Sequence, residues 1–291
     1  MKNVRTSHSI PHAEFFPRPS SANGPGRWLA VVRNDAREMS HFWPVVQNMV
    51  VQEMRIRYHR SMLGFLWTLL NPILMMTTLT LVFSQVFGNK DWKQYAAYLF
   101  AGQVPWTLFG GSLSDCASCI VANEGLIRKI YLPKLVFPLA KVLTNLTTFV
   151  LSLFALYLVG GPFLGARFTP AMVMLPVIIG LFATFALGLG LILAVANTFF
   201  RDTSHLVTVV LQAWYFATPI IWGDKGLPSA LENRCWLNPA FPFIRMFQLI
   251  ISDGQWPTLT LFLAAAGIAT VSLGIGYVTF KTHENKLVFR L

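Results

Sequence analysis

Long uncharged stretches, separated by short charged segments, dominate the pattern of this chain. No charged residue lies between Arg60 and Lys90, and five further stretches each hold at least 20 uncharged, mostly apolar residues. About 20 such residues in a helix cross the hydrocarbon core of a bilayer, since each residue adds about 1.5 Å. We therefore predict an all-α integral membrane protein with six transmembrane helices within residues 62–280. The spans are expected at residues 62–87, 96–121, 135–159, 172–198, 204–223 and 256–280.

The distribution of positive charge predicts the orientation of these spans. Six spans place both termini on the same side of the membrane. If that side is the cytoplasm, sixteen of the 23 Lys and Arg residues lie inside and six outside, with Lys141 in the third span. Cytoplasmic segments of membrane proteins carry an excess of Lys and Arg, so cytoplasmic N and C termini are expected. The net charge of +11 then reflects topology and contact with anionic membrane lipids, and no nucleic-acid partner is expected.

The two ends of the chain are expected to be tails. Residues 1–27 are rich in Ser, Pro, His and Arg and lack the apolar run of a secretory signal. Such a composition is typical of disorder, and we predict a disordered basic cytoplasmic tail over residues 1–38. Residues 281–291 follow the last span and are expected to form a cytoplasmic C-terminal tail.

An amphipathic helix is predicted over residues 39–61, before the first span. Pro44 suits the first turn of a helix. Apolar residues recur every four positions from Val46 to Tyr58, and polar and charged residues occupy another face. This pattern favours a helix lying along the inner membrane surface, either as a simple anchor or with a further role.

A short cytoplasmic segment, residues 123–134, connects the second and third spans. Apolar Leu126 and Ile127 stand next to Arg128 and Lys129, and Pro133 ends any helix. A helix this short cannot bury its apolar side alone. It could rest in the lipid headgroups or dock into a groove on a partner protein.

The segment between the fifth and sixth spans, residues 226–253, is too apolar for an ordinary outer loop. Pro239 and Pro242 interrupt it, and Asn238 followed by proline is a good helix start. We predict short re-entrant helices over residues 228–251 that dip into the outer leaflet and border a pathway. The alternative is a helix lying on the membrane surface.

The residues that would carry catalysis or ion coupling are missing. The chain has no G-x-x-x-x-G-K-[ST] phosphate loop, and the only charged residues inside the spans, Asp115 and Lys141, lie near the inner face. Cys116 and Cys119 form a C-x-x-C without a second ligand pair, so they are interpreted as packed helix residues. We expect no catalytic residue, no metal site and no cofactor in this chain. If it transports, another protein must supply the energy.

Aromatic residues are plentiful, at 14% of the chain. Sugars stack on aromatic rings through their C–H faces, so a dense aromatic group could form a sugar-binding track, although ordinary helix packing explains any single ring. The densest group combines Phe83 and Phe87 of span one with Trp214, Tyr215, Phe216 and Trp222 of span five.

Four stretches carry a resemblance to a known family. They are Arg55–Pro72, Glu124–Lys134, Asn197–Asp202 with Thr218–Trp222, and Asn238–Pro242, and the third is the most specific because Phe-Phe-Arg-Asp precedes Thr-Pro-Ile by about sixteen residues. The chain resembles the permease subunits of type-2 ABC exporters that move O-antigen, capsule or teichoic-acid polymers. Residues 1–40 fall outside the resemblance.

The resemblance implies a homodimer with two copies of a separate ATPase, which would bind ATP and Mg²⁺, in the bacterial inner membrane. The substrate would be a polysaccharide on undecaprenyl diphosphate, with O-antigen the first expectation. Alternatives are an exporter of the same architecture for a lipid, drug or other small substrate, and a passive pore or structural membrane protein.

The resemblance also implies roles for particular residues. ATPase coupling falls to Asn123, Glu124, Gly125, Leu126, Ile127 and Arg128. Recognition of the lipid diphosphate at the inner face falls to Arg55, Arg57, Arg60, Arg128 and Lys129. The aromatic group would line the glycan channel. An outer gate would comprise Asn238, Pro239, Phe241 and Phe243.

Overall fold

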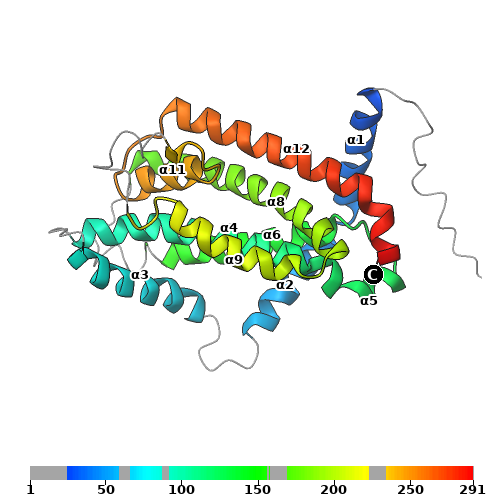
Figure 1. The fold of residues 1–291 in the computed structure, drawn as a ribbon, viewed down its shortest axis with the longest axis horizontal. Coiled ribbons are helices and arrows are strands. Elements are labelled where there is room, and N and C mark those ends of the chain that lie inside the picture. The colour runs from blue at the N-terminus through cyan, green and yellow to red at the C-terminus, as the bar shows by residue number, and fades with distance from the viewer. Residues whose placement is uncertain are drawn as a thin grey trace, which may run out of the picture. The chain divides into compact units, whose positions relative to one another are not determined.

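The computed structural model describes residues 25–58, 66–86, 92–155, 157, 169–222 and 234–290. These residues form helices joined by turns, and none of them lies in a β-strand (Figure 1). The chain divides into two compact units, Met1–Trp43 and Pro44–Leu291. The predicted all-α fold is therefore confirmed over the described part of the chain.

The N-terminal unit contains helix α1 (Pro25–His41). Pro25 is the first helical residue, where its missing N–H costs nothing and its fixed φ angle suits a helix. The Ala, Arg, Glu and Met residues that follow are good helix formers. The prediction of a disordered tail is thus wrong for residues 25–38, and residues 1–24 lie outside the described residues.

The predicted interface helix is helix α2 (Trp43–Tyr58), which begins four residues later than expected. Phe42 lies between α1 and α2, and its N–H donates to the Glu38 carbonyl at 3.0 Å, which closes the last turn of α1. Residues 59–61 of the predicted helix lie outside the described residues.

Helices coincide with all six predicted spans. They are α3 (Leu66–Val86), α4 (Trp92–Ala122), α6 (Val136–Ala155), η2 (Pro170–Met174) with α8 (Leu175–Phe199), α9 (Thr203–Ala217) and α12 (Leu259–Arg290). Among the described residues, three stretches are long and apolar enough to cross a membrane: Val136–Phe154, Pro170–Phe199 and Leu259–Leu287. These helices fit an integral membrane protein, and the number of six spans stays a prediction.

Two helix ends differ from the predicted boundaries by more than four residues. Helix α9 ends at Ala217 rather than at residue 223, because Thr218 precedes Pro219 and is extended (φ −99°, ψ 136°). Helix α12 continues to Arg290, so the predicted tail from residue 281 is helical through residue 290. Lys281 and Glu284 form an ion pair (2.7 Å) on this extension, and Leu287 is fully buried.

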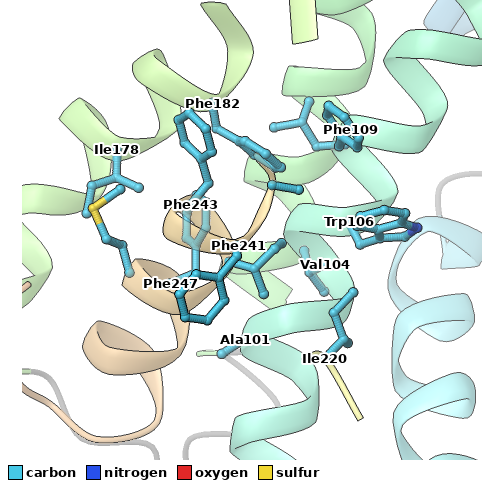
Figure 2. Close-up of a cluster of buried hydrophobic side chains, with 14 of the residues drawn as sticks. Ala101, Val104, Trp106, Phe109, Ile178, Phe182, Ile220, Phe241, Phe243 and Phe247 are labelled. Carbon is cyan, nitrogen blue, oxygen red and sulfur yellow. The ribbon is translucent and has the colours of Figure 1, made fainter. Parts of the chain in front are cut away.

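Phenylalanine rings form the centre of the bundle (Figure 2). The Phe109 ring of α4 stacks on the Phe182 ring of α8, with 5.4 Å between centroids. The Phe185 ring of α8 stacks on Phe243, with 5.1 Å between centroids and nearly parallel planes. Offset stacking of buried rings adds to the free energy gained by burying their surface.

Helix α11 (Phe241–Ile251) supplies Phe243 and is itself buried against α4, α8 and α12. Pro242 in its first turn suits a helix start. This helix falls within the predicted re-entrant region, whereas residues 228–233 lie outside the described residues. The depth of α11 in a membrane stays a prediction.

Candidate functional site

The segment between α4 and α6 forms the short helix α5 (Glu124–Lys129), none of whose residues is buried. Asn123 leads into it, and its side-chain amide donates to the Cys119 carbonyl of α4 at 2.8 Å. Glu124 and Arg128 pair across one turn at 2.8 Å. Gly125 has open space around its Cα, and Leu126 is exposed. Helix α5 therefore has charged and apolar groups on its surface.

Ile127 faces the other way and ties α5 to the bundle. It packs against a set of buried residues that we name the inner hydrophobic cluster: Cys119, Ile120, Phe137, Leu191, Ala194, Val195, Phe280 and Leu287. The cluster joins the ends of α4, α8 and α12 to the start of α6. A force applied to α5 would thus reach four helices through one side chain.

The cysteines of the C-x-x-C are packing residues of these helices. Cys119 belongs to the inner hydrophobic cluster, and both thiols are free and buried. The Cys116 thiol donates to the Pro138 carbonyl at 3.5 Å and packs so closely on Gly190 that a Cβ there would collide with it. This agrees with their interpretation as packed helix residues.

Four charged side chains meet where α2 lies against α4 and α6, and we name them the interface cluster: Glu53, Arg57, Asp115 and Lys141. Lys141 of α6 pairs with Glu53 of α2, and Arg57 of α2 lies 3.9 Å from Asp115 of α4. The Asn145 amide donates to Asp115 at 2.8 Å. The cluster lines a cavity of about 480 Å³.

The interface cluster is the feature that the sequence reasoning missed. Asp115 and Lys141 were recognised as charged residues inside the spans, but not as partners of α2. The available signal was the spacing of Glu53 and Arg57, which lie four residues apart and so share one face of α2.

The cations predicted to recognise a diphosphate have different surroundings in the described part of the chain. Arg57 contacts Asp115 and also donates to Thr148 Oγ1 at 3.1 Å, and Arg128 pairs with Glu124. Arg55 and Lys129 are exposed. The remaining residue of the set, Arg60, lies outside the described residues.

In the predicted aromatic track, some of the described side chains pack within the bundle and one is exposed. The Trp214 indole N–H donates to Asn238 at 2.7 Å, and its ring meets Phe109 edge to face. The Tyr215 hydroxyl donates to Gln103. Phe216 is 65% exposed, so among the described members it is the one that a passing substrate could touch freely.

The two members of this group from span one are not equally described. Phe83 and Trp222 are partly buried and pack against a small cluster that includes Tyr95. The Trp222 indole N–H donates to the Phe216 carbonyl at 3.0 Å. Phe87 lies outside the described residues.

In the predicted outer gate, Asn238 makes several side-chain hydrogen bonds, and Phe241 and Phe243 are core residues. The Asn238 side chain accepts from Trp214, donates to Thr218 Oγ1 at 2.8 Å and accepts from the Ala240 N–H at 3.0 Å. It thus joins the end of α9 to the start of α11. Phe241 and Phe243 are buried in the phenylalanine centre (Figure 2). Pro239 is half-buried in the turn before α11.

The comparison with protein families decides the class of protein. A family described as ABC-2 type transporter matches residues 44–251, which include α5, the interface cluster and α11. The chain belongs to the ABC-2 type transporter family. This confirms the resemblance that the four sequence stretches carried.

Curated relatives of this family member have names that refer to polysaccharide transport. The O-antigen export system permease protein RfbA of Myxococcus xanthus is 34% identical over 252 residues, covering 86% of this chain and 96% of the relative. An RfbA of Klebsiella pneumoniae is 26% identical over 210 residues, covering 70% and 78%. The polysialic acid transport protein KpsM of Escherichia coli is 21% identical over 250 residues, covering 84% and 95%.

Proposed function

We propose that the chain is the membrane-spanning permease subunit of an ABC exporter that moves a polysaccharide out of the bacterial cytoplasm. The observation that carries the proposal is the 34% identity to an O-antigen export permease, which extends over 96% of that relative. O-antigen carried on a lipid diphosphate is the expected substrate, and the bacterial inner membrane is the expected location.

The energy would come from ATP hydrolysed by a separate subunit. The sequence contains no phosphate loop, and α5 offers a partner the exposed Leu126 and the Glu124–Arg128 pair. Through Ile127, motion of α5 would reach the inner hydrophobic cluster. We propose two copies of the ATPase, each docked on one α5.

A homodimer with its pathway between the subunits is supported by the exposed face of α9. His205, Val209, Gln212 and Phe216 recur at intervals of three and four residues along this face, and all four are exposed. A side-chain amide such as that of Gln212 is costly to place against lipid tails, because it would lose its hydrogen bonds to water. A face of mixed polarity suits a wet passage or a second subunit better.

At the inner face, Arg55 and Lys129 are the described cations best suited to meet a diphosphate. Both are exposed. Arg55 lies on α2, and Lys129 is the last residue of α5. Arg57 and Arg128 have carboxylate partners that compete with an anion. The lipid head would therefore be attracted by exposed charges rather than by the interface cluster.

Reconstitution tests the proposed function. The permease and its ATPase are placed in proteoliposomes, and translocation of a lipid-linked glycan is followed by access of an external glycan-modifying enzyme. We expect movement only with both proteins and hydrolysable ATP, and none with an ATPase variant that binds but does not hydrolyse ATP. Equal movement driven by a proton gradient without the ATPase would refute the proposal. Transport of unglycosylated lipid at the same rate would instead favour an exporter of a small substrate.

A further inference from the structure

The cavity between α2, α4 and α6 has a balanced set of charges on its walls. The interface cluster contributes two carboxylates, Glu53 and Asp115, and two cations, Arg57 and Lys141. Its volume of about 480 Å³ lies within the range of about 300–1,000 Å³ that is typical of small-molecule sites. Ionisable residues within membrane helices are costly and are most often functional.

The charged groups retain capacity for hydrogen bonds toward the cavity. Arg57 has five N–H donors, of which one is given to Thr148, and its 3.9 Å contact with Asp115 is too long for a hydrogen bond. Asp115 accepts from Asn145 and can accept further donors. About a third or more of each of these two side chains is exposed. A ligand with one donor-rich cation and one anion could therefore bind both.

The position of the cluster fits the level of lipid headgroups. Asp115 lies seven residues before the end of α4, and Lys141 lies five residues after the start of α6, so both are about 7–11 Å from the inner ends of their helices. Ile56 of α2, an apolar side chain that lines the cavity, is 66% exposed. An acyl chain of an inner-leaflet lipid could pass beside this side chain.

We infer that this cavity binds the headgroup of a zwitterionic phospholipid with a primary amine, as in phosphatidylethanolamine. The protonated amine would donate to Asp115 and Glu53, and the phosphate would accept from Arg57 and Lys141. The acyl chains would leave the cavity beside Ile56. The bound lipid would then connect α2 to the two spans that flank α5.

The charge balance favours this ligand over a diphosphate. A diphosphate brings at least two negative charges and no donor for the carboxylates, so it would face Asp115 and Glu53 unfavourably. A zwitterion matches both signs at once. The inference goes beyond the proposed export of a polysaccharide, so its failure would leave that proposal standing.

Lipid selectivity of the unaltered protein is the first test. The purified exporter is equilibrated with equal amounts of phosphatidylethanolamine, phosphatidylcholine and phosphatidylglycerol of the same acyl chains, and retained lipid is counted by native mass spectrometry. We expect one phosphatidylethanolamine per permease subunit, preferred about tenfold over the other two. Phosphatidylcholine has no N–H to donate, and phosphatidylglycerol has no amine. Equal retention of the three lipids would overturn the inference.

Two variants and a matched control locate the site. Asp115→Asn and Arg57→Gln each remove one charge of the interface cluster and should lower retention of phosphatidylethanolamine about tenfold. Asp202→Asn removes the same charge as Asp115→Asn at an exposed position outside the cavity and should leave retention unchanged. If both aspartate variants retain the lipid equally, the inference is wrong. Thermal unfolding of each variant shows whether a loss of lipid binding is due to a loss of folding. The selectivity test uses the unaltered protein, so it does not depend on the folding of any variant.

Soluble O-phosphoethanolamine distinguishes a lipid from a free ligand. The compound carries the same amine and phosphate without acyl chains, so it should not displace the lipid at equal concentration. The variant Ile56→Ser should weaken retention of the lipid, since it removes the proposed acyl contact. Displacement of the lipid by the soluble compound at equal concentration would overturn the assignment to a membrane lipid.

Discussion

Two glycines allow α8 and α12 to cross with their backbones in contact. A Cβ on Gly276 would overlap the backbone of Gly188, and a Cβ on Gly188 would lie 2.5 Å from Ser272 O. The Ser272 hydroxyl donates to the Phe185 carbonyl at 3.1 Å near the same crossing. Small residues at such crossings let membrane helices approach closely and gain packing energy.

Gly276→Ala should therefore destabilise the permease. The added methyl group must push α12 away from α8, and overpacking of this kind typically costs about 1–3 kcal/mol. Thermal unfolding in detergent or lipid measures the effect as a lower Tm. Gly274→Ala is the matched control, because nothing lies within 4 Å of a Cβ there, and it should leave Tm unchanged or raise it. An equal Tm for the two variants would contradict the close crossing.

At the scale of elements, α2 is held to the bundle by polar contacts in addition to the packing of Met49 against the inner hydrophobic cluster. Lys141 pairs with Glu53, Arg57 donates to Thr148, and Thr148 also lies 3.9 Å from the Met54 sulfur. Polar attachment allows an interface helix to shift without exposing a large apolar surface. The position of α2 should accordingly depend on charge.

Charge reversal at the α2–α6 pair tests this attachment. Lys141→Glu places two carboxylates together and should lower stability, whereas Lys141→Glu with Glu53→Lys restores opposite charges and should recover most of the loss. The coupling energy of the double-mutant cycle is expected at about 1–3 kcal/mol, because both side chains are largely buried. Limited proteolysis at the ends of α2 and thermal unfolding provide the readouts. A double variant as unstable as Lys141→Glu would show that the pair does not hold α2.

The sequence pattern predicted the elements better than their contacts. Apolar stretches and prolines predicted all six helices of the spans and the helix after Asn238, because length and hydropathy are local properties. The early end of α9 followed from Thr218 before Pro219, which the length argument ignored. The helical residues 25–38 were missed because a composition rich in Ser, Pro and Arg was weighed above local helix propensity.

The candidate sites were harder to predict because contacts join residues far apart in sequence. Helix α5 was recognised from its own residues, whereas the pairing of Glu53 with Lys141 joins positions 88 residues apart. Phe241 and Phe243 were expected at a gate; both are buried in the phenylalanine centre, and a gating role stays a prediction. An apolar residue in a membrane protein has the same sequence signature in a core, a pathway or a lipid contact.

At the scale of the whole molecule, two exposed helix faces differ in polarity. The exposed face of α12 includes Leu263, Val271 and Ile275 and suits lipid. The exposed face of α9 combines apolar residues such as Val209 with Gln212. An exporter that conducts a polymer needs a polar passage, so α9 is the better candidate to face a second copy of the chain.

Disulfide cross-linking tests which face meets the second copy. In a symmetric dimer, residues near the two-fold axis meet their own counterparts, so a single cysteine there can link two subunits. Val209→Cys should give a covalent dimer after treatment with an oxidant or with a short bifunctional maleimide. Val271→Cys should not form such a dimer. The two valines are similarly exposed, at 65% and 60%, and the native cysteines Cys116, Cys119 and Cys235 are buried and should not react. A cysteine on a face that contacts only lipid should not link two subunits. A link through Val271→Cys but not through Val209→Cys would therefore move the proposed dimer interface from α9 to α12.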